Sequence, residues 1–338
     1  MTSSLSQLPE PTRDQLVAGI REGQRRALAK AISLAESTRP DHQALARELM
    51  AAVLPATGQA LRLGITGSPG VGKSTFIEAL GLHLIAKGHM VAVLAVDPSS
   101  SVTGGSILGD KTRMEELSRH PRAFIRPSPA SGALGGVAAH TREAILLVEG
   151  AGFDIVIVET VGVGQSETDV ANLTDVFVLL QLPNAGDDLQ AIKKGIVELA
   201  DIFVYNKRDL DPAAADRAMA QMASAMTLLR STSSSWRPPV LAASALRREG
   251  IDAFWNQVLR CHEELKASGE LDAKRKRQAL AWTWHLIDTG LRERFRNDPR
   301  VNHALPAILQ QVAAGTLTPA MAAKSLLDGN GAGEDDRA

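Results

Sequence analysis

The first part of the chain carries apolar side chains at helical spacing. The apolar positions fall into two runs, Leu16, Ile20, Leu28, Ile32 and Leu34, and then Leu45, Leu49 and Val53. The polar stretch Ser37–Asp41 between them contains a proline and is typical of a break between helices. The pattern therefore predicts two helices between residues 13 and about 53.

From Leu61 onward the pattern changes to short runs rich in β-branched residues. These runs are Leu61–Ile65, Met90–Val96, Asp154–Val158, Val176–Leu180, Ile202–Tyr205 and Val240–Ala243, and most of them alternate with helix-length segments. Nearly continuous apolar strands separated by helices are typical of a mostly parallel sheet that is covered on both faces. We therefore expect an α/β fold in which the sheet lies between helices.

Only helical periodicity remains after Leu271, in two pieces that break near Asn297–Pro299. The basic run Lys274–Arg277 within this part is expected to form a solvated helix face. The patterns together divide the chain into four parts: an N-terminal helical extension (1–57), an α/β domain (58–267), a C-terminal helical arm (268–327) and a disordered tail (328–338).

Composition and charge exclude several classes of protein. The 338 residues include 37 Lys and Arg against 38 Asp and Glu, a formal charge of −1, which excludes a strongly basic nucleic-acid binder. The longest uninterrupted apolar stretch, Met90–Val96, is far shorter than the ~18 residues of a membrane span. The N-terminus has no secretory pattern, and the single cysteine, Cys261, permits no internal disulfide. We expect a cytoplasmic protein that binds neither membranes nor nucleic acid.

A glycine-rich motif with a complete phosphate-binding pattern follows the first predicted strand. Its residues are Gly67, Ser68, Pro69, Gly70, Val71, Gly72, Lys73, Ser74 and Thr75, which fit G-x-x-x-x-G-K-[ST] and enter a helix. The glycines let backbone N–H groups surround phosphate oxygens, and the helix dipole points at the same anion. Lys73 is expected to neutralise β- and γ-phosphate charge, and the Ser74 hydroxyl to ligate Mg²⁺. The motif, a P-loop, predicts a nucleoside triphosphate site.

A second motif, Asn206-Lys207-Arg208-Asp209, follows another predicted strand and indicates which base is bound. The Asp209 carboxylate can accept hydrogen bonds from the N1–H and 2-amino groups of guanine, whereas adenine would leave it unsatisfied. Asn206 would brace the loop, and the stem of Lys207 would lie over the base. Ser244-Ala245-Leu246, after the last strand, is expected to present backbone N–H groups to guanine O6. We therefore expect GTP and GDP as ligands.

Other strand ends supply candidates for magnesium binding and catalysis. Glu159 ends a strand where nucleotide hydrolases place an acid that holds Mg²⁺ through water. Asp97 ends a strand at the same sheet edge, and Asp110 follows in a Gly- and Ser-rich segment, where it faces the same site or caps a helix. Val163 stands where Ras-like enzymes have a water-orienting glutamine, and Gln165 either takes that role or is a mobile loop residue. We therefore expect slow intrinsic hydrolysis.

A further loop, Leu182–Lys194, leaves a strand end and enters a helix. Asp187 is expected to cap that helix, and Lys193, one turn further on, would by default lie on its solvated face.

Taken together, the segments GSPGVGKST, DPSSSVTGGSILGDKTRM, ETVGVGQSE, PNAGDDLQAIKKG and NKRD resemble the MeaB/ArgK family of GTPases. The resemblance runs from about residue 15 to residue 327. Members of this family are chaperones of cobalamin-dependent acyl-CoA mutases, chiefly methylmalonyl-CoA mutase. The resemblance therefore implies a metallochaperone-type P-loop GTPase fold, a mutase as partner and a homodimer formed through the C-terminal arm.

The resemblance also implies roles for single residues. It implies a magnesium site made of Ser74, Asp97, Asp110 and Glu159. It further implies that Leu182–Lys194 senses the mutase, that Asp187 and Lys193 change position when the partner docks, and that Lys193 stabilises γ-phosphate charge. The expected catalytic residues are Lys73, Glu159 and Lys193.

The sequence thus predicts a Mg²⁺-dependent GTPase that gates the loading or protection of a mutase cofactor. Two alternatives remain open. A kinase of a transport system would need an acceptor pocket with a base near the γ-phosphate, and the sequence contains no H-R-D-type loop. A nickel-type metallochaperone GTPase would need a Cys/His site, and the single cysteine argues against one.

Overall fold

A computed structural model describes residues 11–97, 114–129, 136–160, 166–183, 194–226 and 233–328. The strands in this part of the chain are β1 (Leu61–Gly67), β2 (Val91–Asp97), β3 (Ala123–Pro129), β4 (Ile155–Thr160), β5 (Val176–Gln181), β6 (Ile202–Tyr205) and β7 (Val240–Ala242). They form one sheet of order β3-β2-β4-β1-β5-β6-β7, in which every pairing is parallel. The prediction of an α/β fold with a mostly parallel sheet is confirmed.

The sequence pattern did not predict β3. Only Ala123–Ile125 is apolar in this strand, and Pro127 and Pro129 interrupt the β pattern. In the described sheet β3 is an edge strand and pairs with β2. A proline is tolerated at an edge because its missing N–H can face away from the neighbouring strand. An edge position therefore accepts a sequence that a central strand would reject.

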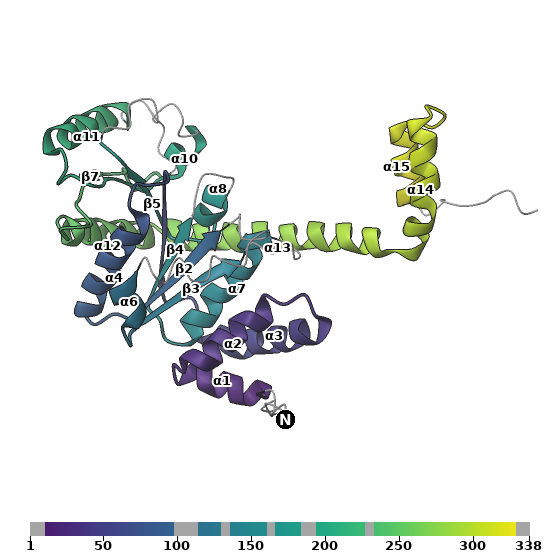
Figure 1. The fold of residues 1–338 in the computed structure, drawn as a ribbon, viewed down its shortest axis with the longest axis horizontal. Coiled ribbons are helices and arrows are strands. Elements are labelled where there is room, and N and C mark those ends of the chain that lie inside the picture. The colour runs from purple at the N-terminus through teal and green to yellow at the C-terminus, as the bar shows by residue number, and fades with distance from the viewer. Residues whose placement is uncertain are drawn as a thin grey trace, which may run out of the picture. The chain divides into compact units, whose positions relative to one another are not determined.

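Helices cover both faces of the sheet (Figure 1). On one face lie α4 (Lys73–Ala86), α6 (Glu115–Arg119) and α12 (Ile251–Ala267), and on the other lie α7 (Gly136–Gly150), α8 (Ser166–Ala171), α10 (Lys194–Leu199) and α11 (Pro212–Met226). Side chains alternate between these two cores along each strand. In β2, for example, Val91 and Val93 face the α4 side, whereas Ala92 and Leu94 face the α7 side.

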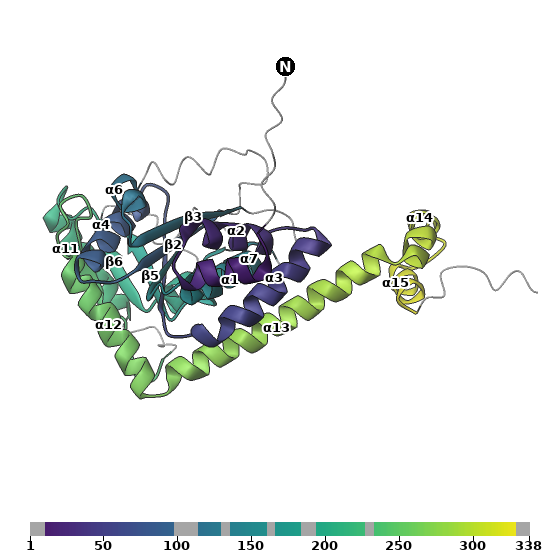
Figure 2. The same cartoon turned by 90° about the horizontal axis from the view of Figure 1, so that it is seen from below.

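The N-terminal part forms three helices, not the two that the pattern predicts. They are α1 (Arg13–Arg21), α2 (Arg25–Ala35) and α3 (Pro40–Val53), followed by the 3₁₀ turn η1 (Leu54–Ala56). The unpredicted break lies at Gly23, whose φ of +70° ends α1, a conformation that glycine adopts readily. Figure 2 shows these helices beside α7, and their apolar residues join its core.

The C-terminal part forms α13 (Glu270–Asn297), α14 (Pro299–Ala313) and α15 (Pro319–Leu327). The predicted break near Asn297–Pro299 is confirmed, and Asp298 caps α14 by accepting a 2.8 Å hydrogen bond from Arg300 N. The pattern did not predict the second break, between α14 and α15. The chain divides into two compact units, Met1–Gln278 and Ala279–Ala338, and the second has a small core of its own, made of Ala304, Ile308 and Ala322.

The basic run at the start of α13 is only partly solvated. Lys274 Nζ donates to Asp175 O at 2.7 Å, and Arg275 forms two hydrogen bonds to the Asp175 carboxylate, at 2.8 and 2.7 Å. The expectation of a solvated face was therefore wrong for these two residues. It holds for Lys276 and Arg277, which are exposed.

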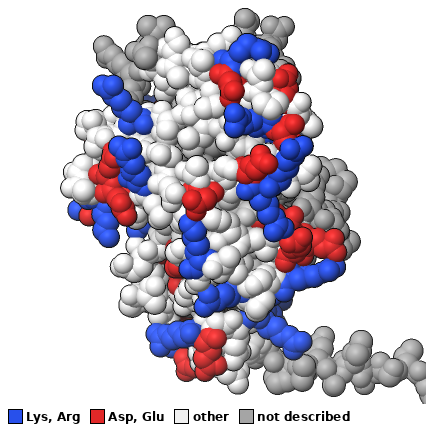
Figure 3. Space-filling view, turned by 90° about the vertical axis from the view of Figure 1, so that its left-hand side faces the viewer, with Lys and Arg blue, Asp and Glu red and all other residues white. Residues whose placement is uncertain are grey.

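The surface in Figure 3 carries Lys and Arg side chains interspersed with Asp and Glu, so this face has no large patch of one sign. Among the residues that the structure describes, no helix is long and apolar enough to cross a membrane.

Candidate functional site

The P-loop lies between β1 and α4, at the carboxyl edge of the sheet. Gly72 has a φ of +91°, and a Cβ at this position would lie 2.9 Å from Asn206 Nδ2. A Cβ at Gly67 would lie 2.4 Å from Leu180 O. Both positions require glycine, because a side chain would collide with neighbouring polar atoms. The motif is therefore packed closely against the ends of β5 and β6.

Lys73 is the first residue of α4 and is buried, with 8% of its surface exposed. Its Nζ donates to Gly67 O at 2.7 Å and to Ser68 O at 3.3 Å, so the ammonium lies over the P-loop backbone. The helical hydrogen bonds of α4 begin with Phe76 N to Gly72 O, at 2.9 Å. The amides before Phe76 have no acceptor within the helix, and together with Lys73 they form an anion-binding geometry.

Ser74 meets an acid from β4. Its Oγ donates to Glu159 Oε1 at 3.2 Å, and Glu159 is only 3% exposed. In the sheet Glu159 is the partner of Ile65 in β1 and of Ala95 in β2, so it lies at the carboxyl ends of three strands. A hydroxyl and a carboxylate that converge beside an anion-binding loop are the oxygen donors that Mg²⁺ prefers.

Asn206 connects the base motif to the P-loop. It is 1% exposed, its Nδ2 donates to Val71 O at 2.9 Å, and its Oδ1 accepts from Ala245 N at 3.1 Å. One side chain thus fixes three loops relative to one another. The next residue, Lys207, has a φ of +60°, a strained conformation for a side-chain-bearing residue of the kind that recurs at functional sites.

Asp209 is held by the loop that follows β7. Ser244 Oγ donates to Asp209 Oδ1 at 2.5 Å and accepts from Arg247 N at 3.2 Å. The side chain of Ser244 therefore orients the Asp209 carboxylate, a contact that sequence reasoning missed because it assigned only backbone groups to this loop. Leu246, in the same loop, is 77% exposed.

The remaining candidate residues are less fully described. Asp97 is the last residue of β2, beside β4, so its backbone lies at the same sheet edge as Glu159. Asp110, Gln165, Asp187 and Lys193 lie outside the described residues, as does most of the C-terminal tail.

Two buried polar side chains lie next to this site. Gln181 and Tyr205 are paired residues at the ends of β5 and β6, and are 5% and 2% exposed. Within the part of the chain that the structure describes, neither the amide of Gln181 nor the hydroxyl of Tyr205 has a hydrogen-bond partner. Burial raises the pKa of Tyr205 to about 12, which keeps the phenol neutral. Sequence patterns give no signal for such an arrangement.

Replacing Tyr205 with phenylalanine should leave the free energy of unfolding unchanged or raise it by about 1 kcal/mol, because the change removes an unsatisfied buried hydroxyl and keeps the ring. Urea unfolding of the nucleotide-free protein would measure this. Tyr205→Leu, which also loses ring packing, should destabilise the protein. A loss of more than about 1 kcal/mol in the phenylalanine variant would mean that the hydroxyl has a partner.

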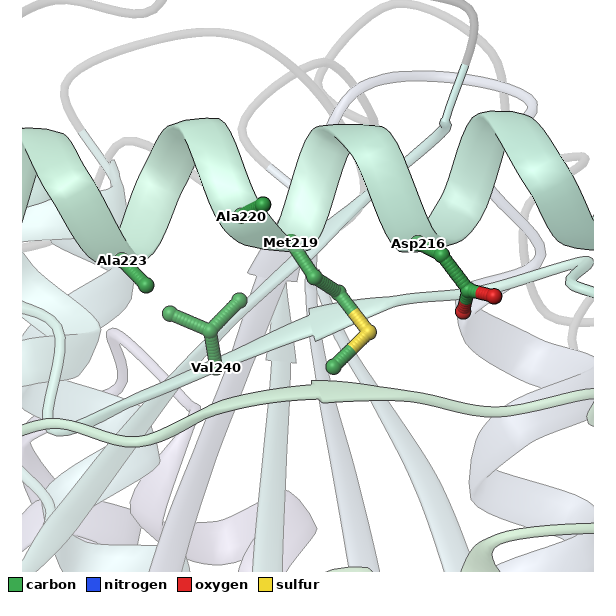
Figure 4. Close-up of a pocket in the computed structure, with 5 residues that line it drawn as sticks. All are labelled: Asp216, Met219, Ala220, Ala223 and Val240. Atoms are coloured by element: carbon green, nitrogen blue, oxygen red, sulfur yellow. The ribbon is translucent and has the colours of Figure 1, made fainter.

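A separate groove lies between α11 and the edge strand β7 (Figure 4). Its volume is about 350 Å³, and it is lined by Asp216, Met219, Ala220, Ala223 and Val240. Its one carboxylate, Asp216, pairs with Arg208 at 3.2 Å. The groove offers small apolar surfaces and no anion-binding group, so the P-loop edge is the better candidate for chemistry.

Known proteins resemble this chain in sequence and in fold. A family model described as "Methylmalonyl Co-A mutase-associated GTPase MeaB" matches residues 28–300. A probable GTPase of Mycobacterium tuberculosis is 52% identical over 94% of this chain and 95% of its own. The mitochondrial methylmalonic aciduria type A homolog of Mus musculus is 47% identical over 96% and 81%. A crystal structure titled "LAO/AO transport system kinase" superposes with a TM-score of 0.75 at 39% identity, covering 96% of this chain and 99% of the other.

Proposed function

The chain belongs to the MeaB family of methylmalonyl-CoA mutase-associated GTPases, and from this premise we propose that it gates cofactor loading or protection on a cobalamin-dependent acyl-CoA mutase. The chain is a GTPase. Methylmalonyl-CoA mutase is the proposed partner, since the family is described by its association with that enzyme. Bound nucleotide would reorder loops at the carboxyl edge of the sheet, and those loops would bias mutase binding.

One observation carries the proposed nucleotide site: Asn206 ties the P-loop carbonyl of Val71 to the Ala245 amide, so phosphate and base loops form one rigid cradle. The Asp209 carboxylate would accept from guanine, and the Lys207 stem and Leu246 would flank the base. The residues proposed to bind the nucleotide are Gly67, Ser68, Pro69, Gly70, Val71, Gly72, Lys73, Ser74, Thr75, Asn206, Lys207, Asp209, Ser244, Ala245 and Leu246.

Magnesium fits the proposed site because Ser74 and Glu159 bring a hydroxyl and a carboxylate within 3.2 Å of each other. These two residues would hold the ion, with Asp97 and Asp110 as further candidates from the sequence. When bound, Mg²⁺ would neutralise charge on the β- and γ-phosphates.

In the proposed reaction a water molecule attacks the γ-phosphorus in line with the bond to the β–γ bridging oxygen, which breaks to give GDP and phosphate. Lys73 would neutralise charge on the transferred group, and Glu159 would fix the hydroxyl of Ser74. Because Val163 replaces a water-orienting glutamine, intrinsic turnover would be slow, and Gln165 is the nearest candidate for that task.

The proposal is tested by incubating the purified protein with γ-labelled GTP, with and without the apo form of methylmalonyl-CoA mutase. We expect slow release of inorganic phosphate by the protein alone and faster release with the mutase. ATP in place of GTP is the control and should give little phosphate. No effect of the mutase on either hydrolysis or nucleotide affinity would contradict the proposed coupling, because coupling is reciprocal.

Replacing Lys193 with alanine should leave GTP affinity nearly unchanged and lower mutase-stimulated turnover about tenfold, the effect of one lost charge contact of about 1.4 kcal/mol in the activated state. Titration calorimetry and a stimulated-turnover assay would measure the two quantities. A collapse of basal GTP binding would instead assign Lys193 to the static pocket. Asp187, on the same loop, is proposed to move with it when the partner docks.

A kinase is the second candidate, because the crystal structure of a transport system kinase is similar over nearly the whole chain. It predicts that the label moves from GTP to an acceptor molecule in preference to water, which the same assay would detect.

A nickel-type metallochaperone would need a Cys/His site. Cys261 is fully buried, and burial raises the pKa of its thiol, so it is a poor ligand. Equilibrium dialysis against nickel should detect no tight binding.

We also propose a homodimer that forms through the C-terminal arm and a cytoplasmic location. Leu280, Trp284, Ile287 and Leu291 support the dimer, because they recur three and four positions apart on α13 and are 43–65% exposed. The proposed divisions remain 1–57, 58–267, 268–327 and 328–338.

A further inference from the structure

Two buried threonine hydroxyls join the ends of β1 and β4. Thr66 Oγ1 and Thr160 Oγ1 lie 2.8 Å apart and form a hydrogen bond in which either hydroxyl can donate. The two residues are 94 positions apart in the chain, and they are 2% and 0% exposed. Each is next in sequence to a residue of the proposed site, because Thr66 precedes Gly67 of the P-loop and Thr160 follows Glu159.

This bond lies one residue beyond the described register of the two strands. The last pair in the register of β1 and β4 is Ile65 with Glu159. Thr66 and Thr160 are the next residues along the two strands, so their side-chain bond continues the pairing at the carboxyl edge. Because successive side chains of a strand point to opposite faces, the two hydroxyls lie on the face opposite to Ile65 and Glu159.

The proposed magnesium donors depend on the same two strand ends. Ser74 Oγ donates to Glu159 Oε1 at 3.2 Å. Ser74 belongs to the P-loop motif, which begins at the end of β1, whereas Glu159 belongs to β4. The distance between the two donors therefore depends on how closely the ends of β1 and β4 are held together, and the Thr66–Thr160 bond is a contact that holds them.

The bond fixes a spacing more than it holds the sheet together. On the other side of β4, Thr160 is paired with Val96 in β2, so β4 would stay in the sheet without the hydroxyl bond. The spacing matters for Mg²⁺, because this ion demands near-ideal octahedral geometry with oxygens at about 2.1 Å. A small displacement of Glu159 from Ser74 would therefore weaken Mg²⁺ binding before it disturbed the fold.

We propose that Thr66 and Thr160 are positioning residues whose hydrogen bond sets the distance between Ser74 and Glu159, and with it the affinity of the nucleotide complex for Mg²⁺. The inference rests on the nucleotide and magnesium site proposed above and adds two residues to it. Both threonines act through Glu159 and the P-loop, and neither is assigned a direct contact with the ion.

A matched pair of hydroxyls allows stability and positioning to be separated. Thr66→Val or Thr160→Val alone leaves the other hydroxyl buried without its partner, which is costly. The double variant replaces both hydroxyls by methyl groups of similar shape, which can be nearly neutral for stability. We therefore expect the urea midpoint to fall in each single variant and to return close to the wild-type value in the double variant.

The test of the proposal is a Mg²⁺ titration of the full-length double variant in complex with a fluorescent GDP analogue. The Mg²⁺ concentration at half-saturation should rise about 3- to 10-fold, the range that corresponds to one hydrogen bond. Affinity for the analogue without Mg²⁺ should stay within twofold of wild type. Thr160→Ser, which keeps the hydroxyl, should retain the wild-type Mg²⁺ dependence.

Thr174→Val is the matched control. Thr174 is also fully buried, and its Oγ1 donates to Val170 O at 2.9 Å, in the turn before β5 at the opposite edge of the sheet. This variant removes an equally buried hydroxyl bond that does not join β1 to β4. It should leave the Mg²⁺ dependence unchanged.

A double variant with wild-type stability and wild-type Mg²⁺ dependence would overturn the proposal, because the two hydroxyls would then only satisfy each other. If the double variant fails to fold, Thr66→Val is titrated in its place. A 3- to 10-fold weaker response to Mg²⁺ in Thr66→Val would support the proposal, and a wild-type response would overturn it.

Failure of this proposal can be told apart from failure of the proposed function. The titration uses GDP and Mg²⁺ and requires neither hydrolysis nor a mutase, so a mutase without effect would remove only the proposed partner. Wild-type protein that binds the GDP analogue with a Mg²⁺ dependence shared by the double variant would remove only the role of the threonines. Wild-type protein that binds no guanine nucleotide would overturn both.

Discussion

Lys73→Ala should lower kcat/KM for GTP by about 10³-fold, the effect of removing one preorganised charged donor from a transferring phosphoryl group. The Lys73 ammonium is buried and donates to Gly67 O at 2.7 Å, so it is already held over the loop that we propose binds the phosphates. Steady-state phosphate release would measure the loss.

Lys87→Ala is the matched control for this experiment. Lys87 caps the other end of the same helix, where it pairs at 2.7 Å with Asp252 on the surface. Exposed pairs of this kind contribute little, so turnover should remain at the wild-type value. A Lys73→Ala protein that retained more than a tenth of wild-type kcat/KM would contradict the P-loop assignment.

Asp209→Asn should change the base preference from guanine to xanthine nucleotides. The kcat/KM for GTP should fall about 10³-fold. A site built around a hydrogen-bonding group discriminates this strongly, because a mismatch leaves buried groups unpaired. The structure indicates how the new amide would be oriented. The Ser244 hydroxyl, 2.5 Å from Asp209 Oδ1, would donate to the amide oxygen. The NH₂ group would then face the base and meet the 2-oxo group of xanthine.

Competition between GTP and xanthosine triphosphate in one assay would measure the change of preference. Asp216→Asn is the control, because Asp216 is a surface carboxylate paired with Arg208 beside the same loop. It should leave the preference unchanged. Retained selectivity for GTP in Asp209→Asn would show that another group reads the base.

The parts of the proposed site that could be predicted from the sequence are those formed by residues that follow one another in the chain. The P-loop and the Asn206–Asp209 motif each place their groups through local backbone geometry, so spacing alone located them between a strand and a helix. The central strands were equally clear, because strands buried on both faces consist almost entirely of apolar residues.

The contacts that the sequence did not reveal join residues far apart in the chain. Arg275 and Asp175 are separated by 100 positions, and nothing near either residue indicates the other, so the basic run resembled an ordinary solvated helix face. The edge strand β3 was hidden by its two prolines, and the break between α1 and α2 depends on the single glycine Gly23. For Arg275 and for β3 the surrounding fold decided the outcome, whereas for the break after α1 one residue did.

The position of Asn206 has a consequence for how a nucleotide would leave. Its amide is shared by the Val71 carbonyl and the Ala245 N–H, so the loops proposed to hold the phosphates and the base have one support in common. Tilting this single side chain would unseat the purine and loosen the polyphosphate in one event. A nucleotide-exchange factor would therefore need to bind on only one side of the nucleotide site. GDP would then dissociate in a single kinetic phase.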